Sequence, residues 1–172
     1  MRDFQLPGRS PIRVTEAAAA TSQPLATLTA IETLRRGGNA IDAAVAAAAV
    51  LAVVEPESTG IGGYGFMLYA PAGGSKVIAF NGSGHSPKAA TTDWYLERGL
   101  TEIPMYGPHA VTVPGLVDAW ATLTADHGTR GLDELLQPAI RYAEEGFVVH
   151  DRVAFDWARV ADRLAKDPNA TR

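Results

Sequence analysis

The glycine-rich segment 60–65, Gly-Ile-Gly-Gly-Tyr-Gly, has the residue spacing most suggestive of chemistry in this sequence. The spacing matches a fingerprint that binds the pyrophosphate of a dinucleotide. That chemistry requires a strand before the glycines and a helix after them, because the helix N-terminus faces the phosphates. The flanking residues predict the opposite order. We therefore interpret the glycines as permitting close backbone approach at a helix-to-strand corner, and we expect no cofactor.

Other side chains that could bind a metal or attack a substrate are few. The chain has no cysteine, which excludes disulfides, thiolate metal sites and cysteine nucleophiles. Neither a phosphate-binding Walker loop nor a Gly-x-Ser-x-Gly elbow is present. We expect no metal site, because no two histidines have the spacing of a zinc helix; they are His85, His109, His127 and His150.

Composition and charge indicate one globular domain. The 172 residues are 47% hydrophobic and 20% charged, as is typical of a globular protein. This length is sufficient for one domain with a hydrophobic core and is short for two domains. The formal net charge of −4 repels phosphate backbones, so we expect no nucleic-acid binding. The longest apolar run, 40–54, contains Asp42 and is shorter than the roughly 20 residues that cross a bilayer, so we expect no membrane span. The start lacks the apolar core of a signal peptide, which predicts a cytoplasmic protein, although a trimmed export signal would give the same start.

Hydrophobic periodicity and helix-breaking residues predict helices on both sides of one hairpin. The helices are expected at about 24–36, 40–55, 92–96, 116–128, 132–145 and 151–164. The hairpin strands are expected at 66–70 and 76–80, with a further brief strand at 109–113. Capping residues are expected at the helix starts; in chain order they are Ser22 or Gln23, Asn39, Thr92 or Asp93, and Asp151.

The inward faces of the helices follow from the same periodicity. On the first helix, apolar residues recur every three positions: Leu25, Leu28, Ile31 and Leu34. On the fifth, the expected inward residues are Leu135, Leu136, Ile140 and Ala143, with Pro138 kinking or restarting the helix. Asn39 and Asp42 are interpreted as structural, because capping explains both.

This order of elements indicates an α+β fold with too few strands. A two-stranded sheet is marginal in water, and alanine-rich helices need a broad surface on which to pack. We therefore expect 1–172 to be a single partial domain whose sheet is completed by other polypeptide. The chain by itself is expected to expose apolar surface and to self-associate.

Six blocks follow one another along the chain: Pro24-Leu-Ala, 34–44, Val54-Glu-Pro56, 58–63, Val113-Pro-Gly115 and 137–147. In this order they resemble the opening of the large subunit of γ-glutamyltranspeptidases. The Gly-Gly-Asn-Ala-Ile-Asp-Ala-Ala sequence at 37–44 is specific, whereas the shorter blocks gain weight from their order. The resemblance covers nearly all of positions 10–150.

The resemblance implies an N-terminal-nucleophile hydrolase, an αββα sandwich of two stacked sheets between helical layers. This chain would supply helical layers and an incomplete antiparallel sheet. The family's precursor cleaves itself into two subunits and frees a threonine, which attacks the γ-glutamyl amide of glutathione-like substrates. The acyl group then passes to water or to an amino acid or peptide. The nucleophile belongs to the small subunit, so we expect no catalytic residue in this chain and no activity from the chain alone.

The resemblance also implies where substrate binds. In the family, an arginine four residues before a proline binds the α-carboxylate of the donor. Here the proline is Pro87 and Ser83 occupies that position; segment 81–86 contains no arginine, and Lys88 comes after the proline. Losing a guanidinium–carboxylate pair weakens binding roughly tenfold to a hundredfold. Amides of acyl groups other than γ-glutamyl therefore remain candidate substrates.

Ser83, His85 and Asn81 are the candidate substrate-binding residues. Ser83 and His85 would line the acyl pocket, with His85 supplying a donor or a charge that titrates near about pH 6.5. The alternative for both is an ordinary solvated loop, and for Asn81 it is an Asx turn before Gly82. Three hypotheses stay open: an enzyme of this family, either a γ-glutamyltranspeptidase or a cephalosporin-acylase-like amidohydrolase; a non-catalytic binding or scaffold relative; and a dinucleotide-binding domain.

Overall fold

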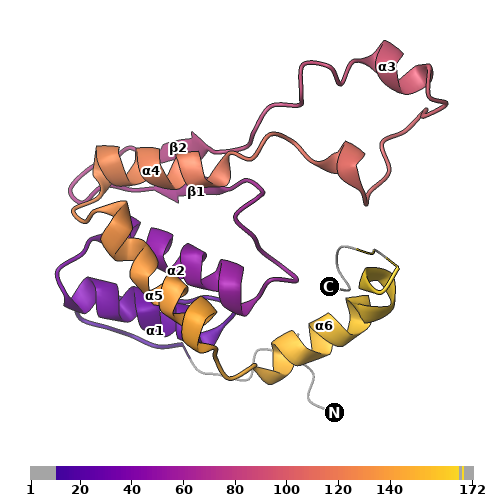
Figure 1. Ribbon diagram of the computed structural model, residues 1–172. Helices are drawn as coiled ribbons and strands as arrows, with labels where there is room; N and C mark the ends of the chain where they lie inside the picture. Colours follow the sequence, from indigo (N-terminus) through magenta and orange to yellow (C-terminus); the bar gives the residue numbers. More distant parts are fainter. Residues whose placement is uncertain (1–10, 167, 169–172) are drawn as a thin grey trace.

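The computed structural model describes residues 11–166 and 168. In Figure 1, α1, α2 and α5 lie together, the hairpin and α4 lie on one side of them, and the segment between β2 and α4 extends away as an arm. None of the helices in the described part of the chain has the length and apolarity needed to cross a bilayer. The elements in chain order are α1 Pro24–Arg35, α2 Ala40–Val54, β1 Phe66–Tyr69, β2 Ile78–Asn81, α3 Thr92–Leu96, the 3₁₀ turn η1 Pro108–Ala110, α4 Leu116–His127, α5 Leu132–Glu145 and α6 Asp151–Leu164.

Helix α2 forms the centre of the core. Its alanine and valine side chains are mostly buried, with Val45, Ala46 and Val50 completely so. Small side chains on every face allow the neighbouring helices to approach closely, and α1, α4 and α5 all pack against α2. The alanine-rich segment is therefore the buried helix that the sequence predicts.

Helix α1 packs on α2 through small side chains rather than through the expected row of leucines. Ala26 and Ala30 are buried, whereas Leu28 is 48% exposed. Leu25 and Leu34 are partly buried at the margin of the core. The expectation for Leu28 is wrong because a close helix pair leaves room between its axes only for small residues.

Helix α5 covers the other side of α2 with a stripe through Leu135 and Ala139. Pro138 lies inside one continuous helix and does not restart it. Ile140 and Ala143, both expected inward, are exposed. Ile140 follows Ala139 by one residue, about 100° further around the helix, and this rotation turns it to solvent.

The hairpin pairs β1 with β2 in antiparallel register, with Phe66 opposite Asn81. One face adds Met67 and Phe80 to the core. On the other face, Phe66 and Leu68 are 67% and 78% exposed. The described residues thus contain a two-stranded sheet with one uncovered apolar face, in agreement with the expected incomplete sheet.

The strand expected at 109–113 is wrong. Pro108–Ala110 forms a 3₁₀ turn, and the residues that follow have no regular structure up to α4. Pro108 and Pro114 flank the segment, and neither has the N–H group that a strand ladder requires.

Two helix starts agree with the sequence and two differ by one residue. Gln23 accepts hydrogen bonds from the first turn of α1, and Asn39 and Asp42 form a capping box on α2. Helix α3 is capped by Thr91 rather than Thr92 or Asp93, and α6 by His150 rather than Asp151. Each correction lies within the uncertainty of a helix boundary read from sequence.

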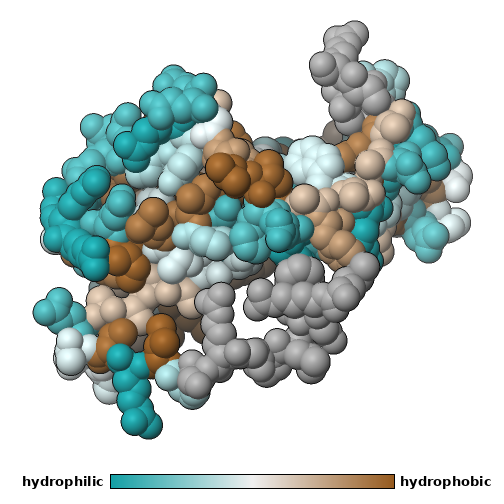
Figure 2. Space-filling model, turned by 90° about the horizontal axis from the view of Figure 1, so that it is seen from below, coloured by the Kyte–Doolittle hydropathy of each residue, from teal (hydrophilic) through white to brown (hydrophobic). Residues whose placement is uncertain are grey.

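The three tryptophans have different surroundings. Trp120 of α4 is buried, with 4% exposure, whereas Trp157 of α6 is 44% exposed. Trp94 of the arm packs edge to face against Tyr95. Figure 2 shows hydrophobic side chains lying uncovered among hydrophilic ones on the face seen from below.

Candidate functional site

Three chain segments meet at the N-terminus of α4. Gly82 N donates to Gly65 O at 2.9 Å, and Val113 N donates to His85 O at 2.9 Å. Gly63 O accepts from Gly115 N at 3.1 Å and from Leu116 N, in the first residue of α4, at 3.2 Å. We call residues 63–65, 82–85 and 113–116 the glycine junction. Its hydrogen bonds fix the loop that leaves β2 against the start of α4.

At several glycines of the junction, backbone packing leaves no room for a Cβ. A Cβ at Gly84 would lie 1.4 Å from Val113 O, and one at Gly115 would lie 2.5 Å from Gly82 O. These positions need glycine because backbone lies directly against backbone. Within segment 60–65 the close approach expected from the sequence holds for Gly65, where a Cβ would lie 2.7 Å from Leu116 Cδ1. It is wrong for Gly60 and Gly62, where a Cβ would meet nothing within 4 Å.

The junction holds the loop that carries the three candidate substrate-binding residues. Asn81 Oδ1 accepts from Ser83 N at 3.0 Å, which is the Asx turn that the sequence allowed. Ser83 and His85 are exposed, and their side chains make no hydrogen bond with other described residues. The backbone of this loop is thus fixed while the Ser83 hydroxyl and the His85 imidazole stay available to a ligand.

A cavity of about 480 Å³ begins where this loop continues into the arm. Its wall includes Ser86 and Pro87 of the loop and apolar or aromatic side chains of the arm, among them Tyr95, Met105 and Val111. A concave, mainly apolar wall beside a few polar groups is typical of a small-molecule site. Ser83 and His85, which the sequence analysis expects in an acyl pocket, are not among the residues that line this cavity. The cavity could take the apolar part of an acyl group.

Around the loop, the described residues lack two kinds of reactive group. The described residues contain no cluster of histidine, aspartate or glutamate that could hold a metal ion. Beside Ser83 or His85 there is also no hydrogen-bonded nucleophile and base within the described residues. What the loop and cavity offer is binding and orientation.

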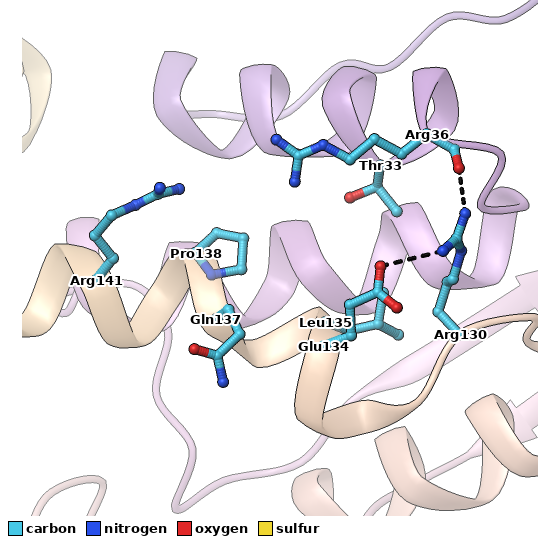
Figure 3. A pocket seen from close by; sticks show the side chains of 8 residues that line it. All are labelled: Thr33, Arg36, Arg130, Glu134, Leu135, Gln137, Pro138 and Arg141. Atoms are coloured by element: carbon cyan, nitrogen blue, oxygen red, sulfur yellow. Dashed lines mark hydrogen bonds and ion pairs between the residues drawn. The ribbon is translucent and has the colours of Figure 1, made fainter.

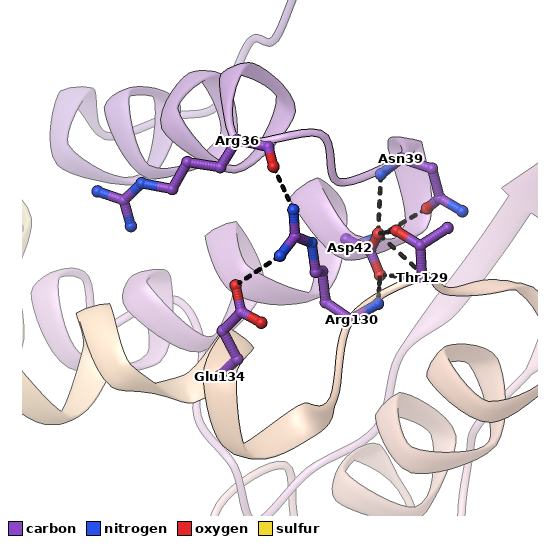
Figure 4. Close-up of polar contacts among 6 residues, drawn as sticks. All are labelled: Arg36, Asn39, Asp42, Thr129, Arg130 and Glu134. Carbon is purple, nitrogen blue, oxygen red and sulfur yellow. Dashed lines mark hydrogen bonds and ion pairs between the residues drawn. The ribbon is translucent and has the colours of Figure 1, made fainter.

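Asp42 has partners that the sequence did not reveal (Figure 4). Besides the capping bond from Asn39 N at 2.8 Å, it accepts from Thr129 N at 3.0 Å, Thr129 Oγ1 at 2.6 Å and Arg130 N at 3.2 Å. Burial by itself would raise the pKa of the Asp42 carboxyl, but these hydrogen bonds outweigh it and hold the pKa below its ordinary value. The structural role assigned to Asp42 holds, and it includes tying α2 to the turn before α5.

Comparison with known proteins shows the family of this chain. The γ-glutamyltranspeptidase family model matches residues 26–172. The glutathione hydrolase-like YwrD proenzyme of Bacillus subtilis (strain 168) is 46% identical over 117 residues, which is 67% of this chain and 22% of that relative. The chain therefore spans about a quarter of the length of such relatives.

Solved structures agree with the sequence comparison. The γ-glutamyltranspeptidase of Helicobacter pylori superposes with a TM-score of 0.85 at 35% identity, covering 93% of this chain and 47% of that one. A cephalosporin acylase from Bacillus halodurans superposes with a TM-score of 0.81 at 40% identity, covering 95% of this chain and 32% of that one. The expected fold class, a portion of an N-terminal-nucleophile hydrolase, is confirmed, and the chain belongs to the γ-glutamyltranspeptidase family.

Proposed function

We propose that the protein containing this chain cleaves amide bonds by acyl transfer of the γ-glutamyltranspeptidase type. The observation that carries the proposal is the family match over residues 26–172, which includes both the core and the loop after β2. The nucleophile is a threonine freed by self-cleavage, in a second subunit of the same precursor. Its α-amine acts as base for its hydroxyl, and the acyl-enzyme transfers its acyl group to water or to an amine.

The part of this chain in that reaction is to hold the acyl donor. Asn81 shapes the loop, while Ser83 and His85, which precede the cavity-lining Ser86 and Pro87 in the chain, present polar side chains to the donor. The glycine junction keeps the loop in place, and a positional error of about 1 Å at a reacting group is enough to slow catalysis. The chain alone carries out no turnover.

A second donor class is favoured by one specific observation. Segment 81–87 contains no arginine to pair with the α-carboxylate of a γ-glutamyl group, and the cavity beside it is lined largely by apolar side chains. An acylase that cleaves amides of more apolar acids fits these two features. The similarity to a cephalosporin acylase supports the same alternative.

Intact-mass spectrometry and a substrate panel test the proposed function. The full-length protein is expected to yield two chains, the second starting with threonine, and to hydrolyse at least one chromogenic anilide from a set of γ-glutamyl and N-acyl compounds. The control is a variant with alanine at that threonine, which stays uncleaved and inactive. An uncleaved wild-type protein that turns over no member of the panel would refute the proposal and favour a non-catalytic relative.

Restoring a guanidinium at position 83 tests the donor pocket directly. Ser83→Arg is expected to lower the KM for a γ-glutamyl anilide about tenfold, because the new side chain can pair with the α-carboxylate. The KM for an N-acyl anilide without that carboxylate should change by less than about twofold. Ala89→Arg adds the same charge at a nearby exposed position that does not line the cavity, and it is the matched control. Equal effects of the two variants would place the donor elsewhere.

A further inference from the structure

A second pocket lies on the helical layer, away from the loop after β2. It has a volume of about 310 Å³ and opens between the C-terminal end of α1 and the first turns of α5 (Figure 3). Three arginines line it: Arg36 follows α1, Arg130 lies in the turn before α5, and Arg141 projects from α5. Glu134 is the carboxylate in the lining. The pocket thus has an excess of positive charge in a chain whose net charge is −4.

The three guanidinium groups are held to different degrees. Arg130 donates to the backbone carbonyl of Arg36 and pairs with Glu134 at 3.3 Å, so its position is fixed (Figure 4). Arg36 reaches Glu32 only at 3.7 Å, with both side chains substantially exposed, and such a pair contributes little. Arg141 makes no hydrogen bond or ion pair with other described residues. Two guanidinium groups can therefore turn toward a ligand beside a third that is already placed.

The chemistry of this lining selects the ligand. A guanidinium presents paired N–H donors that match two oxygens of a carboxylate or a phosphate. Thr33 and Gln137 are the neutral polar side chains of the wall, and each already donates to a helix carbonyl, at 2.9 and 3.1 Å respectively. Like-charge repulsion among the arginines disfavours a cation, and an anion relieves that repulsion.

We propose that this pocket binds a small anion with at least two negatively charged oxygens, either a phosphate group or a dicarboxylate. None of the segments that form the pocket belongs to the loop after β2 or to the arm. Occupancy of the pocket is therefore measured by binding, without reference to activity.

Calorimetric titration of the full-length protein tests the site. One titration uses inorganic phosphate and a second uses glutarate, both at constant ionic strength in chloride. Saturable binding of at least one anion is expected, and the anion that binds shows whether the ligand is a phosphate group or a dicarboxylate. The double variant Arg36→Gln, Arg141→Gln should bind at least about tenfold more weakly, because two charge-assisted contacts are lost. The control, Arg35→Gln with Arg159→Gln, removes the same charge from exposed positions outside the pocket and should bind like wild type.

Two results would overturn the proposal: no saturable binding of either anion, or equal weakening in the pocket variant and the control. Thermal melts establish that the variants are folded. If the double glutamine variant does not fold, the same titration is carried out on the double variant Arg36→Lys, Arg141→Lys. Lysine keeps the positive charge and removes the paired N–H donors. It is expected to weaken binding several-fold, and unchanged binding would contradict bidentate recognition.

Discussion

Gly84→Ala is expected to lower the free energy of unfolding of the full-length protein by about 3 kcal/mol, the largest effect among the glycines of the junction. The added Cβ would lie 1.4 Å from Val113 O, so the loop after β2 and the segment before α4 cannot keep their present separation. Moving the loop also moves Ser83 and His85. Under the proposed function, we expect kcat/KM to fall at least about tenfold. Urea denaturation and anilide hydrolysis measure the two effects.

Gly62→Ala is the matched control for this experiment. It lies in the glycine-rich segment before β1, where a Cβ would meet nothing within 4 Å, and its backbone has no positive φ. Its unfolding free energy and its activity should stay close to those of wild type. If Gly84→Ala behaved in the same way, the close packing of the junction would have no energetic importance.

Asp42→Asn should destabilise the protein by about 3 kcal/mol at neutral pH. The carboxylate is fully buried and accepts from Asn39, Thr129 and Arg130. Asparagine has the same shape, but it replaces one acceptor with an NH₂ group that would face backbone donors, and it removes the charge that strengthens every bond. Asp126→Asn, at an exposed position of α4, is the control and should change stability by less than about 0.5 kcal/mol.

The pH dependence of the Asp42 contribution has a definite sign. Because the folded-state pKa lies below the ordinary carboxyl value, the contribution is complete above about pH 4 and is lost as the pH falls through the folded-state pKa. The stability gap between wild type and Asp42→Asn should therefore be constant near neutrality and narrow in acid. A gap that widened on acidification would show that the carboxylate is not stabilised in the folded state.

The sequence predicted the elements formed by local interactions. Alanine and valine at nearly every position of 40–54 predicted a buried helix, and the Asn39 cap predicted its start. Two short apolar runs separated by a turn predicted the hairpin to within two residues. These features depend on neighbours in the chain, for which residue type is sufficient information.

The features that the sequence did not predict depend on distant partners. Nothing near Asp42 indicates that Thr129 donates to it, because the two residues lie 87 positions apart. Leu28 was expected inside because its spacing is helical, but the choice between the leucine and alanine faces of α1 is decided by how closely α2 approaches. The Gly84 contact likewise depends on where Val113 lies. For the candidate site, the sequence indicated the loop that carries Ser83 and His85. The hydrogen bonds of the glycine junction, which hold that loop, became visible only in the fold.

The tie between α2 and the turn before α5 also bears on how the protein is made. The packed helices come from two stretches of chain, one before the hairpin and one after the arm. The hydrogen bond between Asp42 and Thr129 therefore closes a loop that contains both the hairpin and the arm. Closing so long a loop has an entropic cost, and contacts of such separation slow folding. During synthesis on the ribosome, the face of α2 that packs against α5 therefore stays exposed until the hairpin, the arm and α5 have all been synthesised. During that interval its exposed apolar surface can associate with other unfinished chains.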